Sequence, residues 1–132
     1  MGELINLKCQ KCGYETNLGI GAGILFNRVE NILEFFDRET AEKIKALAAD
    51  GDIFWSVTKE AGVCEKCGKI SAIAVFKATD KNGKTTELRG RCQCGSSSIE
   101  IYDYESLQDG RKKIFCPACG DELEITIQGH WD

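Results

Sequence analysis

The stretch CQKCG at residues 9–13 decides how this chain folds, because three further stretches repeat it: CEKCG at 64–68, CQCG at 92–95 and CPACG at 116–120. The four couples account for all eight cysteines, and a glycine follows each couple directly. Two thiolates on one tight turn can reach one metal ion, and two such turns complete a tetrahedral Cys₄ site. The sequence therefore predicts two Zn²⁺ sites, built from Cys9, Cys12, Cys64, Cys67, Cys92, Cys94, Cys116 and Cys119.

The spacing within each couple suits thiolate ligands. A short turn aims backbone N–H groups at the sulfur atoms, which stabilises their negative charge. A glycine after the second cysteine adopts a positive φ without steric cost. The couple Cys92–Cys94 is tighter by one residue, but Gly95 follows it in the same place. Iron is a second metal that the same sulfur atoms can bind.

Two other uses of cysteine fit the pattern less well. Disulfides between cysteines this close in sequence make strained rings, and a reduced intracellular chain does not keep them. A thioredoxin-like dithiol needs one C-x-x-C, whereas four couples in one small chain favour metal binding.

Length and charge narrow the function classes. With 132 residues and 42% apolar side chains, the chain can form one domain or two small ones. The formal net charge of -4 becomes about -8 with two Zn(Cys)₄ centres, so general polyanion binding is not expected. No apolar run approaches the roughly 18 residues that span a bilayer, so no membrane partner is expected. The start MGELINLKCQKCG lacks a signal-peptide layout, and we expect a cytoplasmic protein.

Helical periodicity is confined to one segment, at about 27–50. Asn27 with Glu30 resembles a capping box, and an apolar stripe at Val29, Ile32, Leu33 and Phe36 follows it. Asp37 is a second cap candidate, for a helix that runs to about Ala49 and turns Ile44, Leu47 and Ala48 inward. One long helix kinked near Asp37 is an open alternative. The glycine-rich stretch 13–26 is expected to be a flexible or closely packed backbone that crosses from the first couple to this segment.

The rest of the chain predicts short strands. Expected strands cover 3–8, 53–59, 70–79, 85–91 and 98–104, with a hairpin turn at 81–84. Residues 112–115 are expected to lead into the fourth couple, and residues 123–127 to lead out of it. The fold class is therefore α+β: short hairpins carry the cysteine couples, and a helical segment is inserted between the first two couples.

The sequence leaves open which couples share a metal. Sequential pairing joins the first two couples and the last two, and we favour it because neighbours along the chain usually lie together. Nested pairing joins the two middle couples and the two end couples, which the direct hairpin between Gly68 and Arg91 supports. Interleaved pairing is the third arrangement. Loop entropy does not discriminate, since doubling a loop costs only about 0.6 kcal/mol.

The motifs CQKCGYE at 9–15, CEKCG at 64–68, CQCG at 92–95 and CPACGDE at 116–122 resemble the zinc-ribbon superfamily. The first and last also resemble the two halves of rubredoxin, and the opening with the closing CPACG resembles small uncharacterised zinc-ribbon proteins of bacteria. This resemblance implies zinc and a ribbon fold, without an activity. We expect a first zinc-ribbon unit at 1–68, carrying the helical insertion, and a second at 69–132; one compact domain is the alternative.

No catalytic set is expected. An all-cysteine zinc site leaves no coordination position for water or substrate, so we expect no enzyme activity. His130 is the only histidine, and without a partner it is interpreted as a solvated residue near the end of the chain.

Three hypotheses for function follow. The first is a non-enzymatic module that binds a protein with a basic patch, as the negative charge favours. The second is nucleic-acid binding by basic residues interleaved with aromatic ones. The third is rubredoxin-like electron transfer by bound iron. The residues considered for nucleic-acid binding are Lys84, Arg89, Arg91, Arg111, Lys112 and Lys113, with Tyr102, Tyr104 and Phe115.

Overall fold

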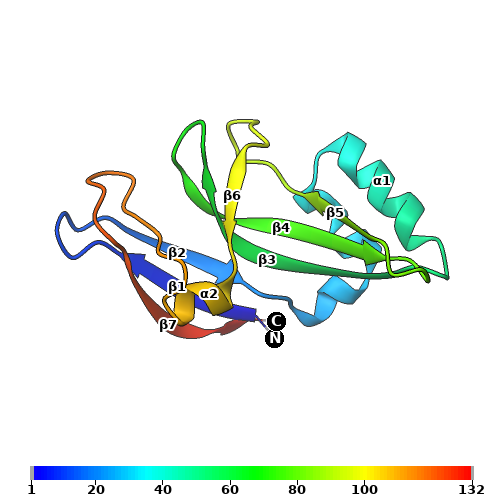
Figure 1. Ribbon diagram of the computed structural model, residues 1–132, viewed down its shortest axis with the longest axis horizontal. Coiled ribbons are helices and arrows are strands. Elements are labelled where there is room, and N and C mark those ends of the chain that lie inside the picture. The colour runs from blue at the N-terminus through cyan, green and yellow to red at the C-terminus, as the bar shows by residue number, and fades with distance from the viewer. Residues whose placement is uncertain (1, 132) are drawn as a thin grey trace.

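A computed structural model describes residues 2–131, which form two antiparallel sheets lying end to end along the long axis (Figure 1). The first sheet has the strand order β2-β1-β7, and the second has the order β5-β4-β3-β6. The α+β class predicted from the sequence is confirmed, with strands dominating. The strands are β1 Gly2–Lys8, β2 Glu15–Ile20, β3 Phe54–Cys64, β4 Ile70–Thr79, β5 Thr85–Arg89, β6 Ile99–Tyr102 and β7 Glu124–Trp131. The helices are α1 Arg38–Ala48 and α2 Tyr104–Gln108, and the 3₁₀ turns are η1 Ile24–Asn27, η2 Val29–Asn31 and η3 Leu33–Phe35.

The three-stranded sheet joins the two ends of the chain. β1 lies in the middle and pairs antiparallel with β2 on one side and β7 on the other. Its side chains Ile5 and Leu7 are fully buried, in a cluster that also contains Ile114 and Leu123. The first and last described residues consequently lie side by side (Figure 1).

The four-stranded sheet is built around the long hairpin of β3 and β4. Its register runs from Phe54 opposite Thr79 to Val63 opposite Ile70. The predicted turn at 81–84 is present: Gly83 has a φ of 84°, and the Asp80 carboxylate accepts the backbone N–H groups of Asn82 and Lys84. β5 and β6 are shorter than the predicted strands 85–91 and 98–104.

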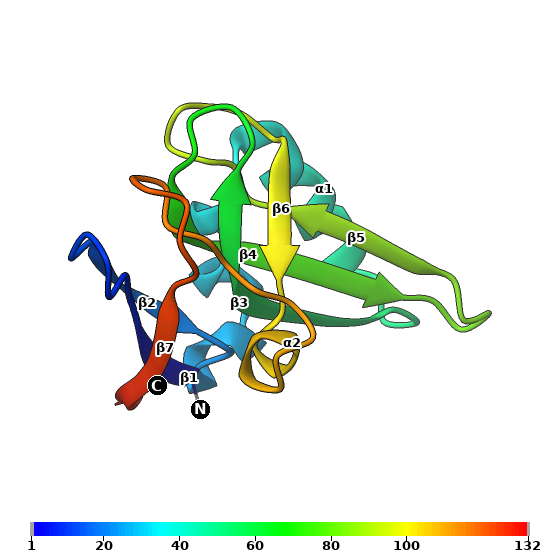
Figure 2. The ribbon, with the colours of Figure 1, turned by 60° about the vertical axis from the view of Figure 1, so that its left-hand side comes forward.

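A short contact links the two sheets. Gly21, directly after β2, exchanges two backbone hydrogen bonds of 2.7 and 2.8 Å with Lys59 on β3. Figure 2 shows β2 and β3 in the region where the two sheets meet. The predicted division of the chain at residue 68 is not a division between sheets, because each sheet takes strands from both 1–68 and 69–132.

The glycine-rich stretch 13–26 contains a strand that the sequence analysis missed. β2 alternates buried Leu18 and Ile20 with more exposed residues, as a half-buried strand does. Gly19 lies between them against the indole of Trp131, 3.4 Å from where a Cβ would stand. The glycines therefore serve close packing here.

The helical segment is only partly as predicted. α1 begins after Asp37, whose carboxylate accepts the Thr40 N–H at 2.9 Å, and its inward residue Ile44 is fully buried. The predicted α-helix from Asn27 to Phe36 is wrong, because the backbone there makes separate 3₁₀ turns. Arg28 is extended, at φ -114° and ψ 127°, and this interrupts any continuous helix.

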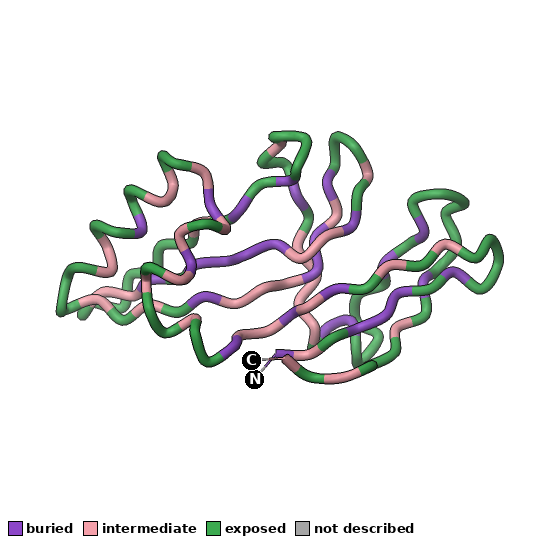
Figure 3. The backbone as a smooth tube through the Cα atoms, turned by 180° about the vertical axis from the view of Figure 1, so that it is seen from behind, coloured by how far each residue is buried: buried purple, intermediate pink, exposed green. Residues whose placement is uncertain are grey.

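The turns around Arg28 still bury the predicted apolar stripe, since Ile32 and Phe36 belong to the core under the second sheet. Buried residues follow the centres of both sheets, while the tips of the cysteine loops and the outer face of α1 are exposed (Figure 3).

Candidate metal centres

The eight cysteines gather into two groups of four. In each group the Sγ atoms all lie within 4.8 Å of one another. The terminal centre consists of Cys9, Cys12, Cys116 and Cys119, and the central centre of Cys64, Cys67, Cys92 and Cys94. This is the nested pairing. The sequential pairing that we favour from the sequence is wrong.

Strand pairing explains the nested arrangement. β1 runs into the first couple, and β7 leaves the last couple, so the β1–β7 ladder sets these two couples side by side. β3 ends at Cys64, which lies opposite Ile99 of β6, and this ladder draws the third couple toward the second. Because loop closure costs differ little between the pairings, the ladders decide among them.

The sulfur geometry fits a metal ion. The Sγ atoms of Cys9 and Cys119 are 3.4 Å apart, and those of Cys12 and Cys116 are 3.5 Å apart. In the central centre the corresponding distances are 3.6 Å for Cys64–Cys94 and 3.5 Å for Cys67–Cys92. Four sulfurs at about 2.3 Å from one Zn²⁺ would stand about 3.8 Å apart. A disulfide bond would require about 2.05 Å. The spacing therefore matches four thiolates around one ion.

All four loops have the same backbone pattern. The carbonyl of the first cysteine accepts the N–H of the following glycine at 2.8–3.0 Å, and the N–H of that cysteine donates to the residue after the glycine at 2.7–3.1 Å. Each glycine has a positive φ, between 77° and 90°, as the sequence predicts. The glycines are Gly13, Gly68, Gly95 and Gly120.

Backbone N–H groups point at the buried sulfurs. The Cys67 N–H lies 3.4 Å from the Cys64 Sγ, and the Ala118 N–H lies 3.3 Å from the Cys116 Sγ. The hydrogen bond from the Cys67 backbone is the first cause that lowers the pKa of Cys64 to about 6. The thiolate, which is the form that binds metal, is thus favoured at neutral pH.

The fourth sulfur of the terminal centre lies in surroundings that disfavour its thiolate when no cation is bound. The backbone N–H of Asp121 favours the thiolate of Cys119, but the surrounding sulfurs and desolvation outweigh it and raise the pKa of Cys119 to about 12. The nearby sulfurs belong to Cys9, Cys12 and Cys116. A divalent cation among the four would reverse this, since it compensates their combined negative charge.

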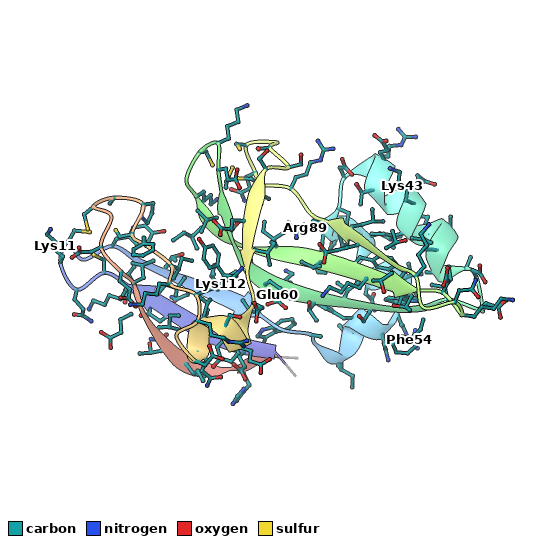
Figure 4. All side chains as sticks on the ribbon, viewed as in Figure 1. Lys11, Lys43, Phe54, Glu60, Arg89 and Lys112 are labelled. Carbon is teal, nitrogen blue, oxygen red and sulfur yellow. The ribbon has the colours of Figure 1, made fainter. Side chains whose placement is uncertain are left out.

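Each centre is anchored in the core on one side and reaches the surface on the other. The first cysteine of every couple is buried, and the second is exposed. A side-chain hydrogen bond also links the two halves of each centre. At the terminal centre Gln10 donates to Glu124 at 2.6 Å, and at the central centre Lys69 donates to Gln93. Figure 4 shows Lys11, from the first loop, at the outer end of the three-stranded sheet.

The basic residues considered for nucleic-acid binding are mostly paired with carboxylates. Arg91 lies 2.9 Å from Asp37, and Arg111 lies 2.7 Å from Asp109. Arg89 and Lys113 form ion pairs as well, with Glu87 and Glu122. Lys112 lies over the ring of Tyr102, 5.4 Å from its centroid. Nucleic-acid binding stays a prediction that this arrangement does not strengthen.

His130 lies on β7, opposite Glu3 of β1, and is exposed.

An exposed apolar surface was missed by sequence reasoning. Ile24 and Leu25 on η1 are 70% and 57% exposed, and Phe54 at the start of β3 is 79% exposed. The half-buried Phe26 lines two hollows, of about 480 and 260 Å³, at this place. We call Ile24, Leu25, Phe26 and Phe54 the apolar surface; Phe54 is labelled in Figure 4. The run Ile24-Leu25-Phe26 after Gly23 was the available signal, because it has no helical or strand period.

No protein-family model, curated protein or solved structure matches this chain. Among residues 2–131, no helix is both long enough and apolar enough to cross a membrane.

Proposed function

We propose that the chain binds two Zn²⁺ ions, one at the terminal centre and one at the central centre, and that both ions are structural. The convergence of the eight sulfurs into two groups, at distances suited to tetrahedral zinc, carries this proposal. Four cysteine ligands leave no position for water or substrate, so the ions stabilise the fold rather than catalyse a reaction.

Metal analysis of protein purified without added metal tests the proposal. We expect two zinc ions per chain in the wild type, and one in each of the variants Cys12→Ser and Cys67→Ser. These positions are exposed, so the substitution removes a ligand without opening the core. A coloured, iron-containing protein would favour the electron-transfer hypothesis instead. Protein without metal that stays folded would overturn the proposal.

We further propose a non-enzymatic role in binding another protein, supported by the apolar surface. Glu30 and Glu34 line the smaller hollow together with Leu25 and Phe26. Apolar side chains next to carboxylates suit a partner segment in which apolar residues stand beside Lys or Arg. The net negative charge of the whole chain favours the same partner.

Paired substitutions test this role. Phe54→Ser changes the apolar surface, whereas Phe115→Ser changes an exposed aromatic residue next to the terminal centre. With a photo-crosslinking amino acid at Ile24, we expect a cross-linked partner with the wild type and with Phe115→Ser, and its loss with Phe54→Ser. The adduct should carry a basic, apolar segment. Equal recovery with both variants would contradict the proposed surface.

A further inference from the structure

We propose that the terminal metal centre controls the apolar surface through Trp131, the last described residue of β7. The inference rests on the proposed metal binding and extends the proposed protein-binding role by giving it a regulator. It is carried by a continuous set of contacts that runs from the terminal centre along β7 to Phe26.

Trp131 locks three strands together. Its indole N–H is shared between two backbone carbonyls, Glu3 on β1 at 3.2 Å and Ile20 on β2 at 3.0 Å. Two glycines make room for the ring: a Cβ at Gly2 would stand 2.1 Å from the indole, and a Cβ at Gly19 would stand 3.4 Å away. The indole therefore occupies a slot that only this combination of small residues leaves open.

The same indole supports the apolar surface. Its ring centroid lies 5.4 Å from that of Phe26, with an interplanar angle of 57°. Phe26 in turn lies 5.4 Å from Phe35, whose ring carries the Lys59 ammonium at 4.1 Å. Since Phe26 lines both hollows of the apolar surface, the position of Trp131 sets the shape of that surface.

The terminal centre sets the position of β7. The strand begins at Glu124, shortly after the loop of Cys116 and Cys119, and within residues 2–131 it pairs with β1 alone. A metal ion shared with Cys9 and Cys12 ties the start of β7 to the end of β1 and so fixes the register of the ladder. A slip of one residue would turn every β7 side chain to the opposite face and remove Trp131 from its slot.

β7 is consequently the element with two states. It is docked when the terminal centre holds its ion, and it is released, with Trp131 out of the slot, when the ion is lost. The strand spans about 24 Å between the centre and Trp131, at about 3.4 Å per residue. The β1–β7 ladder contains one register shift, between Leu4 and Ile5, and the paired residues on both sides of this bulge connect the centre to Trp131.

Tryptophan fluorescence of the full chain tests the inference. In a Trp55→Phe background, Trp131 is the only tryptophan. The double variant Cys12→Ser/Cys119→Ser removes the terminal centre, and Cys67→Ser/Cys94→Ser removes the central one as the matched control. We expect red-shifted emission and acrylamide quenching raised about two-fold or more in the first, as for an indole that leaves packed contacts for water. The control keeps the wild-type emission.

Zinc content, measured on the same samples, separates the inference from the proposed function. If the wild type holds no zinc, the proposed function fails. If it holds two ions, and Trp131 stays protected in the variant without the terminal centre, the inference alone is overturned.

A reciprocal measurement covers the case in which the cysteine variant does not fold. Coupling acts in both directions on binding free energies, so Trp131→Ala should weaken the binding of one of the two ions by about ten-fold in an equilibrium chelator competition, while the other ion is unaffected. Ile127→Ala, a truncation of a half-exposed residue on the same strand, is the control and should leave both affinities unchanged. Trp131→Phe should restore part of the wild-type affinity. Equal affinities for Trp131→Ala and the wild type would refute the coupling.

Discussion

Asp37 makes a quantitative prediction about the attachment of α1. Its carboxylate caps the helix through the Thr40 N–H at 2.9 Å and also lies 2.9 Å from the Arg91 guanidinium, next to the central centre. Loss of an N-cap costs about 1 kcal/mol. A partly exposed ion pair adds about 0.5 kcal/mol. We therefore expect Asp37→Ala to lower the free energy of unfolding by about 1.5 kcal/mol.

Asp37→Asn separates the two contributions. Asparagine caps a helix as well as aspartate does, but it cannot pair with Arg91, so the expected loss is only about 0.5 kcal/mol. Urea unfolding of the zinc-loaded protein, followed by far-UV circular dichroism at pH 7 and fixed zinc concentration, measures both variants. Equal losses in the two variants would show that capping is not the source of stability.

The choice of pH 7 for that experiment follows from the direction in which folding shifts the pKa of Asp37. Hydrogen bonding to Thr40, and then the charge of Arg91, hold the pKa of Asp37 below its ordinary value of 3.8. A carboxyl whose pKa is lowered by folding contributes its full stabilisation above its ordinary, unfolded-state pKa. It loses that stabilisation as the pH falls through the folded-state pKa. At pH 7 the whole effect is present, so a shortfall cannot be attributed to titration.

Three further predictions concern the core, a cysteine loop and a half-buried carboxyl. Ile44→Ala should lower the free energy of unfolding by about 2–5 kcal/mol in the same urea assay, because Ile44 is fully buried where α1 meets the second sheet. An unchanged urea midpoint would contradict that packing. Gly120→Ala should weaken zinc binding at the terminal centre by about 1–2 kcal/mol in a chelator competition, because an alanine is strained at φ 84° even though its Cβ meets no neighbour. Glu60→Gln should stabilise the protein at pH 7.5 and lose that advantage toward pH 4.5. Burial raises the pKa of Glu60 above its ordinary 4.5, so the ionised carboxylate, which is present only at the higher pH, destabilises the fold. A stabilisation by Glu60→Gln that grows in acid would contradict this.

The cysteine loops were predictable because their structure is local. The three or four residues of each couple, the following glycine and the hydrogen bonds between them lie within six consecutive positions at most. The β3–β4–β5 meander and the cap at Asp37 were predictable for the same reason. Such signals do not depend on the rest of the fold.

The pairing of the couples was not predictable, because it depends on which strands meet. The order of couples along the chain favours sequential neighbours, yet β7 returns to β1 after more than a hundred residues. The ladder of Ile5 and Leu7 with the last strand, rather than the loops between couples, brings the end couples together. No local pattern in the sequence predicts a contact between residues so far apart along the chain.

The helical insertion shows a second limit. Val29, Ile32 and Phe36 keep a spacing that suits an α-helix, and they are directed inward in the structure. The backbone is nonetheless broken into 3₁₀ turns at Arg28 and Ile32, although the segment packs against the second sheet. Periodicity identified which side chains are buried, but it did not determine the conformation that buries them.

X-ray absorption at the zinc edge tests the central claim most directly, because it reports the ligands of the bound ion itself. The two nested Cys₄ centres predict a first coordination shell of four sulfur atoms at about 2.3 Å, with no nitrogen or oxygen ligand. A shell that mixes sulfur with lighter atoms would contradict the assignment of all eight cysteines as ligands.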